Sequence, residues 1–356
     1  MSFKKTVAAL LFCLFMVCVP LYVFDRLDDG VNLSHGTGYK GILTLWHVDS
    51  FEGGRGSRSE FLKGRAIEFE AQHKGVLVSV QNYTYEQVKQ KLADGDRFDL
   101  ISFSAGVGFD VKGLLSPYTS AVNVRDDLLE GGKINGNIYA IPWAYGGYAL
   151  YAYESMIKTD AKLSPASAFD FAFLKSDRHK TQVSSLGVGL AAFNNPFRAL
   201  KTGGAKKSSS TNAFYNQSLT SYQAYESFLS KDDFVVLLGT QRDLSRFNLK
   251  ESQGKLEPLS VGYLSGFTDL VQYVGFCDNG DGRGEYAQAF IEFLTSDDAQ
   301  KKLTRIEMFS PVLEIYSSGM HREMETALSK TLAVTNAFVD PTVLESERKA
   351  DKSLLV

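Results

Sequence analysis

The sequence has little cysteine, little net charge and no clustered histidine, and each shortage excludes a class of protein. Only three of the 356 residues are cysteine, and Cys13 and Cys18 lie in an apolar N-terminal segment, which leaves Cys277 alone in the rest of the chain. A lone cysteine excludes an intrachain disulfide framework there. The formal net charge of −3 offers no basic footprint for nucleic acid, and the apolar content of 44% is that of a folded protein rather than a disordered one.

Motifs for metal, nucleotide or nucleophile chemistry are missing as well. The five histidines show no ligand spacing and are His35, His47, His73, His179 and His321. The glycines at 54–56 lack the third glycine and the following Lys-Ser/Thr of a phosphate-binding loop, and those at 278–282 stand at the wrong places for an EF-hand. No nucleophile elbow or metalloprotease helix occurs. We therefore expect no metal, no cofactor and no catalysis, although the carboxylate pair of a glycosidase leaves no motif.

The segment 1–26 is typical of a membrane anchor or an export signal. Two lysines precede an apolar run at 6–24, close to the roughly 20 residues that cross a bilayer. Basic residues hold the start of such a segment in the cytoplasm, so the rest of the chain is expected outside. No small-residue cleavage pattern follows the run, and neither of its cysteines fits a lipoprotein signal. We favour a retained anchor over a cleaved signal, followed by a polar tether at 27–40.

The first half of the exported chain alternates strands and helices. Short apolar strands are expected at 41–47, 76–80 and 98–103. Between them, apolar residues at helical spacing predict two amphipathic helices, the first beginning near Ser57 or Ser59 and ending at Gly75, and the second ending at Gly95. This alternation indicates parallel βαβ units in one sheet.

The segment 136–154, GNIYAIPWAYGGYALYAYE, predicts a hinge beside a stacking surface. A first strand is expected to end at Pro142, because proline cannot donate to a sheet ladder, and a second aromatic strand follows the glycine pair Gly146-Gly147. Apolar faces beside a hinge suit a protein that closes on a small ligand.

The rest of the chain predicts a second lobe and a helical end. A chain of 356 residues exceeds the usual size of one compact core. Further strands are expected at 234–238, 259–264 and 270–276, and helices at 222–229, 287–294 and from Ser296 onward. The stretch 164–207 is irregular and 203–212 is expected to be an exposed loop.

The loop after the first strand holds the densest group of candidate ligand-binding residues, namely Trp46, Asp49, Glu52, Ser57 and Arg58. Ligands of open α/β sheets bind beyond the carboxyl ends of the strands, and the following helix offers free N–H groups there. A plain glycine-rich connection would explain the same stretch without any ligand.

Other candidates lie at positions expected to face this loop: Ser102, Phe103, Trp143, Tyr145, Gln241 and Phe267. The first two end the third strand at the same rim of the sheet. The aromatic rings of Trp143 and Tyr145 offer flat faces for a sugar or a cationic ligand. Gln241 follows a strand of the second lobe, and Phe267 lies at an expected second crossing. Strand-end chemistry, interdomain packing and a surface turn are the alternative explanations.

Six segments in the same order carry a family resemblance: LTLWHVDSF (43–51), IEFEAQHKGVLVSV (67–80), FDLISF (98–103), GNIYAIPWAYGG (136–147), DDFVVLLGTQ (232–241) and EYAQAFIEFLTSDDAQKKL (285–303). The chain resembles the extracellular solute-binding proteins of ABC transporters, family 1, the carbohydrate-binding, maltose-binding-protein-like kind. The resemblance covers most of the exported chain and is thin at 155–230.

The resemblance implies an α/β, two-lobed periplasmic-binding-protein type II fold. Each lobe would hold a mixed, mostly parallel sheet flanked by helices, with hinge crossings and a ligand cleft. The implied division is 41–145 with 266–315 for lobe I, 146–265 for lobe II, and C-terminal helices at 316–356. By position, the loop residues would line lobe I, Ser102 and Phe103 the floor, Trp143 and Tyr145 the hinge side, Gln241 lobe II and Phe267 the return crossing.

The resemblance also implies a function. The chain would be a monomeric, membrane-tethered receptor outside the cell that closes on a solute, a carbohydrate in the first place, and delivers it to the permease of an ABC importer. The alternatives are a sensing subunit of a membrane signalling system, a binder of a cationic or peptide-like solute, and a surface glycosidase.

Overall fold

A computed structural model describes residues 39–159, 186–203, 219–231, 234 and 236–355. The expected anchor at 1–26, nearly all of the tether and most of the stretch 164–212 lie outside these residues. Within the described part, no helix combines the length and the apolar character needed to span a membrane.

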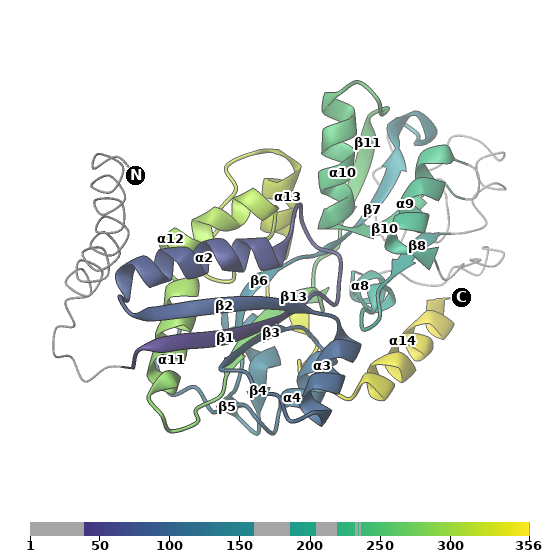
Figure 1. Ribbon diagram of the computed structural model, residues 1–356. Coiled ribbons are helices and arrows are strands. Elements are labelled where there is room, and N and C mark those ends of the chain that lie inside the picture. The colour runs from purple at the N-terminus through teal and green to yellow at the C-terminus, as the bar shows by residue number, and fades with distance from the viewer. Residues whose placement is uncertain (1–38, 160–185, 204–218, 232–233, 235, 356) are drawn as a thin grey trace, which may run out of the picture.

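The first lobe is built on a five-stranded sheet (Figure 1). Its strands, in spatial order, are β2 (Val76–Tyr83), β1 (Gly41–Val48), β3 (Leu100–Phe103), β13 (Val271–Phe276) and β6 (Ile141–Tyr145). β1 pairs in parallel with both β2 and β3, and the helices α2 (Arg58–Gln72) and α3 (Tyr85–Ala93) connect them. β13 runs antiparallel to β3 and β6. The expected parallel βαβ units are therefore confirmed.

Local chemistry explains both connecting helices. The side chain of Ser57 accepts a hydrogen bond from the backbone N–H of Glu60 at the start of α2, and Thr84 forms a capping box with Gln87 at the start of α3. Successive side chains of a strand point to opposite faces, so Leu43 and Leu45 of β1 join the core under α2, whereas Trp46 joins the core under α3.

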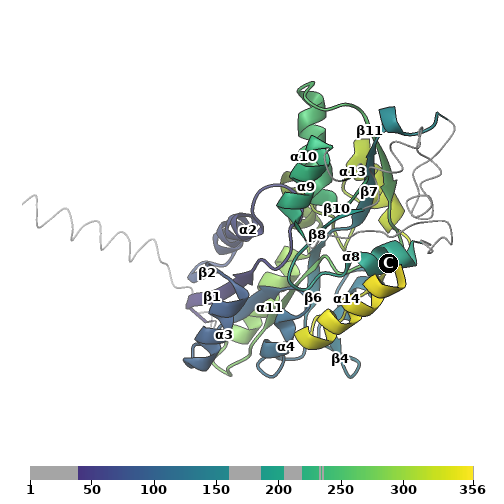
Figure 2. The same ribbon diagram turned by 90° about the vertical axis from the view of Figure 1, so that its right-hand side faces the viewer.

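The second lobe holds the other five-stranded sheet, in the order β11 (Leu259–Tyr263), β7 (Tyr148–Tyr153), β10 (Val236–Thr240), β8 (Gly187–Leu190) and β9 (Leu219–Thr220). β7 is antiparallel to both of its neighbours, and β8 is parallel to β10 and β9. The helices α8 (Pro196–Thr202), α9 (Ser221–Ser230) and α10 (Gln241–Ser252) belong to this lobe. Figure 2 shows the two sheets as separate bodies joined by extended chain.

Two crossings between the lobes are hydrogen-bonded to each other. The outward crossing runs from β6 through Gly146-Gly147 into β7, and the return runs through β12 (Phe267–Thr268) into β13. The backbone N–H of Gly146 donates to the carbonyl of Leu270 at 2.7 Å, and Thr268 Oγ1 donates to the carbonyl of Gly146 at 2.8 Å. The crossings therefore form one connected strap.

The prediction that the first strand of the segment 136–154 ends at Pro142 is wrong. β6 continues through Pro142 to Tyr145. Proline fits there because β6 is an edge strand, so its missing N–H removes no ladder bond on the outer side, and the register of β13 shifts opposite it between Gln272 and Tyr273. The chain instead leaves the sheet at the glycine pair.

The C-terminal part is mainly helical, as expected, and its last two helices pack against the second lobe. Its helices are α11 (Arg283–Leu294), α12 (Asp297–Lys301), α13 (Gly319–Leu328) and α14 (Pro341–Leu355), with the two-residue strand β14 (Ala333–Val334) beside β12. α13 packs against α10, and α14 packs along α8, where the carboxylate of Asp351 accepts from Asn195 and pairs with Arg198 and Lys201.

Candidate functional site

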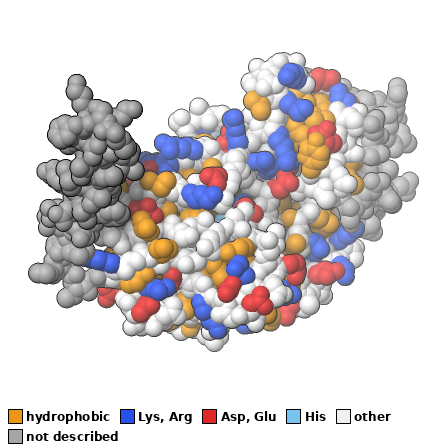
Figure 3. Space-filling model, in the orientation of Figure 1, with side chains coloured by type: hydrophobic (Ala, Val, Ile, Leu, Met, Phe, Trp, Pro, Cys, Tyr) orange, Lys and Arg blue, Asp and Glu red, His pale blue; other side chains and the backbone are white. Residues whose placement is uncertain are grey.

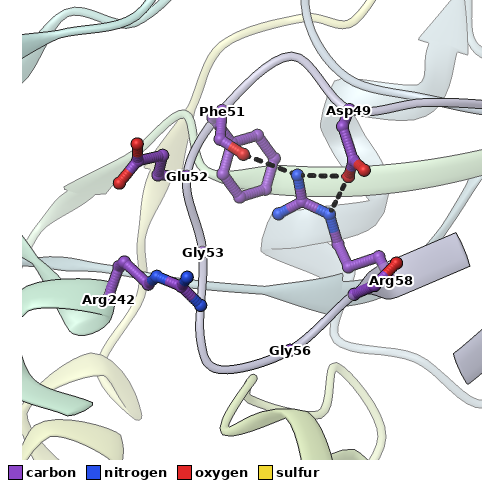
Figure 4. Close-up of a pocket in the computed structure, with 8 residues that line it drawn as sticks. Asp49, Phe51, Glu52, Gly53, Gly56, Arg58 and Arg242 are labelled. Carbon is purple, nitrogen blue, oxygen red and sulfur yellow. Dashed lines mark hydrogen bonds and ion pairs between the residues drawn. The ribbon is translucent and has the colours of Figure 1, made fainter. Parts of the chain in front are cut away.

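A pocket of about 250 Å³ lies where the loop between β1 and α2 meets the start of α10. Its lining residues are Asp49, Phe51, Glu52, Gly53, Gly56, Ser57 and Arg58 of the loop and Arg242 of α10 (Figure 4). Basic side chains gather around the hollow between the two lobes (Figure 3). The pocket thus has one wall from each lobe, at the carboxyl end of β1.

The lobes touch each other directly at this pocket. Arg242 Nη1 donates to the carbonyl of Gly54 at 2.7 Å, and Arg246 Nη2 pairs with Glu52 Oε2 at 2.9 Å. Gln241, which has no exposed surface, accepts from the backbone N–H of Gly147 at 3.1 Å. The first turn of α10 therefore holds both the opposite loop and the outward crossing.

Glycines let the loop pass this close to its neighbours. Gly54 has φ +59°, and a Cβ there would come within 2.0 Å of the carbonyl oxygen of Ile306. A Cβ on Gly53 would lie within 3 Å of both Arg58 Nη1 and Gln241 Nε2. Two nitrogen donors, one from each lobe, therefore flank the backbone of Gly53.

A buried hydrogen-bond network centred on Ser102 supports the loop from below. Its Oγ lies 3.0 Å from Trp143 Nε1 and 3.1 Å from Gln272 Nε2, two groups that only donate. The hydroxyl therefore donates its own proton to the third neighbour, His47 Nδ1, at 3.1 Å. His47 Nδ1 is an acceptor, and the imidazole proton sits on Nε2.

The Nε2–H of His47 faces Asp49 Oδ1 at 3.0 Å. Burial lowers the pKa of His47 below its ordinary value, and this effect outweighs the hydrogen bond with Asp49. For Asp49, burial would raise the pKa, but the hydrogen bond from His47 and the charge of Arg58 outweigh burial and hold the pKa well below its usual range. The pair is a neutral imidazole donating to a carboxylate.

The guanidinium of Arg58 is held on two of its three nitrogens. Nε and Nη2 lie 2.9 and 2.8 Å from Asp49 Oδ1, Nη2 donates to the carbonyl of Phe51 at 2.6 Å, and the group stacks 4.0 Å above the Phe51 ring. Nη1 is buried and has no hydrogen-bond partner among the described residues. Burial lowers the pKa of Arg58, the carboxylate of Asp49 opposes that shift, and the nearby charge of Arg242 adds to it.

Four of the eleven residues expected at the site line the pocket, namely Asp49, Glu52, Ser57 and Arg58. Gln241 lies directly beside it, under Gly53. Phe51, Gly53, Gly56 and Arg242 were not among the expected set. Thr240 caps α10 and forms a capping box with Asp243, a sequence signal that places Arg242 in the first helical turn.

The aromatic candidates are packed inside the lobes. Trp143 has no exposed surface and its ring stacks on Phe61 of α2, with centroids 5.7 Å apart and 5° between the planes. Trp46 is buried against Tyr83 and Phe98. In this arrangement the indole of Trp143 supports the floor of the loop through Ser102 and presents no open stacking face.

The three remaining candidates also lie away from the pocket. Phe103 packs against Phe338, and Phe267 lies under the guanidinium of Arg198. Tyr145 lines a separate cavity of about 230 Å³, where its hydroxyl accepts from Arg125 at 3.1 Å.

Comparison with known proteins identifies the fold. No protein-family model matches the sequence, and no curated protein is significantly similar to it. Solved structures do match. The sugar-binding protein MalE from Xanthomonas citri has 12% identity and a TM-score of 0.63, covering 88% of this chain and 92% of its own. The fold is that of the type II periplasmic binding proteins.

Two further structures show that this fold accommodates different ligands. The GacH receptor of Streptomyces glaucescens, determined with acarbose, has 13% identity and a TM-score of 0.58, and the match covers 89% of this chain and 99% of GacH. The Trichodesmium protein IdiA (FutA), determined with iron and citrate ligands, has 12% identity and a TM-score of 0.61, covering 88% and 99%. In the described part of this chain, no group of three or more His, Cys, Asp or Glu side chains is placed to hold a metal ion.

Proposed function

We propose that this chain is the solute-binding component of an ABC importer. It captures a small solute, a carbohydrate in the first place, outside the membrane and delivers it to a permease. The observation that carries this proposal is the polar pocket whose walls come from both lobes, on a fold shared with sugar-binding and iron-binding receptors.

Closure follows from where the pocket lies. A solute held there touches the β1–α2 loop of one lobe and Arg242 of the other, whereas in an open form it would lose one of these walls. A ligand shifts an equilibrium by its differential affinity for the two states, so binding favours the closed form. The paired glycines at 146–147 provide the bending point, and the hydrogen bonds between the two crossings hold them together as one strap.

The lining favours an organic solute with hydrogen-bonding groups over a bare metal ion. Ser57, Glu52 and Arg242 provide donors and acceptors that suit hydroxyl groups, and the described residues hold no acidic or histidine cluster for a metal. A cationic solute is less well matched, because Asp49 is already paired with Arg58 and Glu52 with Arg246.

The test is a thermal-unfolding screen of the purified full-length chain against neutral monosaccharides and oligosaccharides, uronic acids, polyamines and ferric citrate. A ligand present at 100 times its Kd stabilises the folded state by about 2.7 kcal/mol, which raises the unfolding temperature. We expect at least one carbohydrate to do so. A response to ferric citrate or a polyamine alone would overturn the carbohydrate assignment, and no response to any solute would overturn the receptor proposal.

A further inference from the structure

We propose that the pocket binds an anionic group, a carboxylate or a phosphate, carried by the solute and held between Arg58 and Arg242. This inference rests on the proposed receptor function and narrows its solute to an acidic one, such as a uronic acid or a sugar phosphate. Four observations support it.

The first is the free donor on Arg58. The side chain is 4% exposed, its Nε and Nη2 are bound to Asp49 and Phe51, and Nη1 has no acceptor among the described residues. Figure 4 shows Nη1 on the side of the guanidinium that faces Gly53. A buried donor without a partner is unfavourable, and a charged one more so, so a ligand oxygen at this position would remove an existing penalty.

The second is the unmatched charge of Arg242. Its Nη1 donates to the carbonyl of Gly54, and no carboxylate of the described residues lies within ion-pair distance of it. The neighbouring Arg246, by contrast, is paired with both Glu52 and Asp243. Among the described residues, Arg242 is thus a cation at the pocket wall whose one hydrogen-bond acceptor is neutral.

The third is the repulsion between these two arginines. They come from different lobes, line the same pocket and lie near enough for Arg242 to affect the ionisation of Arg58. Closing the lobes brings two positive charges together in a partly desolvated place, where their interaction is stronger than in water. An anion between them converts that repulsion into two charge-assisted hydrogen bonds.

The fourth is the backbone. α2, 15 residues long, begins at Arg58, and α10, 12 residues long, begins at Gln241, so both helices present their N-terminal ends at the pocket. The side chains of Ser57 and Thr240 each satisfy one backbone N–H there. The remaining N–H groups and the helix dipoles add positive potential where the anion would sit.

The acidic residues of the pocket do not cancel this preference. Asp49 accepts from His47 and from Arg58, and Glu52 pairs with Arg246. Both carboxylates therefore already lie against a cation, whereas Arg58 Nη1 is buried without an acceptor and Arg242 has no carboxylate partner among the described residues. The buried hydrogen-bonding position left open at the pocket is therefore a donor, Arg58 Nη1, which an anionic oxygen would fill.

The experiment titrates the full-length chain with sodium sulfate or phosphate, and with sodium chloride at matched ionic strength as the reference. A second titration compares glucuronate with glucose. The unfolding temperature and the heat of binding in isothermal titration calorimetry are measured. Arg242→Gln is the test variant. Lys250→Gln, which removes the same charge at the far end of α10, is the control. We expect saturable anion binding that Arg242→Gln weakens about 10-fold or more, since hydrogen bonds to charged groups carry about 1.5–3 kcal/mol, while Lys250→Gln leaves it unchanged.

The outcomes separate the two proposals. Equal responses of wild type and Arg242→Gln would reveal a general salt effect and overturn the anion site, as would the absence of any anion response. Binding of glucose but not glucuronate would overturn the anion site and leave the receptor function standing. Saturable sulfate binding that depends on Arg242, without binding of glucose or glucuronate, would support the anion site and overturn the assignment of a carbohydrate solute.

Discussion

Arg246 of α10 and Glu52 of the β1–α2 loop form an ion pair at 2.9 Å that joins the two lobes at the pocket. Both side chains are partly exposed, at 20% and 41%, so the pair is screened by solvent. Such a pair adds only a small free energy to the contact between the lobes, so it does not by itself hold them closed.

Reversing this pair tests its role in closure. The single change Glu52→Arg places two arginines opposite each other and is expected to favour the open form, by about 0.5–1 kcal/mol for a partly exposed pair. Small-angle scattering without ligand should show a larger radius of gyration. Raising the salt concentration screens the repulsion between the introduced arginine and Arg246 and should return the radius toward the wild-type value. An unchanged radius in the single variant would show that the pair has no part in closure.

Removing the Ser102 hydroxyl tests the buried network. Ser102→Ala leaves Trp143 Nε1 without its acceptor and His47 Nδ1 without its donor. It also leaves one N–H of Gln272 Nε2 unpaired, while the other still donates to the carbonyl of Val48. Each orphaned buried group costs about 1–3 kcal/mol, so we expect a loss of several kcal/mol in urea unfolding. The exposed Ser252→Ala is the control and should change stability by less than about 0.5 kcal/mol.

The same network makes a spectroscopic prediction. The ¹⁵N shifts of His47 in the wild type should report a neutral ring protonated on Nε2 at pH 7, because Ser102 already donates to Nδ1. The pKa of His47 lies below its ordinary value, chiefly through burial, so the ring should stay neutral below pH 6.5. A ring protonated on Nδ1 would contradict a hydroxyl proton shared between Ser102 and that nitrogen.

The order of strands and helices was largely predictable because its signals are local. The apolar run of β1, the Ser57 cap and the glycine at position 75 lie within one element or its neighbour. The positions of Trp46 and Trp143 were not predictable in the same way. Whether an indole faces a cleft depends on the strand face and on a distant partner, which for Trp143 is Phe61 of α2.

The charged residues of the candidate site also combine features that the sequence predicts with features that only the structure shows. Asp49, Glu52, Ser57 and Arg58 could be selected because polar residues after a strand and before a helix gather at the rim of a sheet. That Nη1 of Arg58 lacks a partner among the described residues depends on how Asp49 and Phe51 hold the other two nitrogens. That Arg242 lines the pocket depends on how the second lobe lies against the first, which the sequence does not show.

A methyl group at the outward crossing should disturb both the hinge and the site. In Gly146→Ala, the new Cβ would come 2.0 Å from Gln241 Nε2, and Gln241 has little room to move because it is buried and bonded to Gly147. Overpacking of this kind costs about 1–3 kcal/mol. Gly64→Ala in α2, whose Cβ meets nothing within 4 Å, should instead stabilise by about 0.5–1 kcal/mol. Equal effects of the two changes in thermal unfolding would contradict the assigned contact.

The return crossing carries a buried carboxyl group that should govern stability in mild acid. Asp269 accepts from the Tyr148 hydroxyl at 2.6 Å and from the backbone N–H of Asn195 at 2.5 Å. Burial raises its pKa from 3.8 to about 6, although these hydrogen bonds oppose the rise. A folded-state pKa above the unfolded one means that the folded form binds the proton more tightly. Its contribution is therefore fully present below pH 3.8 and is lost as the pH rises through about 6.

The matching variant is Asp269→Asn, which cannot ionise. Relative to this variant, the wild type should lose up to about 3 kcal/mol of unfolding free energy between about pH 4 and pH 7, at roughly 1.36 kcal/mol per pKa unit. Urea unfolding at several pH values gives the difference, with the exposed Asp126→Asn as a control that should run parallel to wild type. Parallel curves for wild type and Asp269→Asn would show that the strap carries an ordinary carboxylate. Because Tyr148 and Asn195 belong to the second lobe and Asp269 to the strap, a confirmed difference would also make the contact between hinge and second lobe pH-dependent.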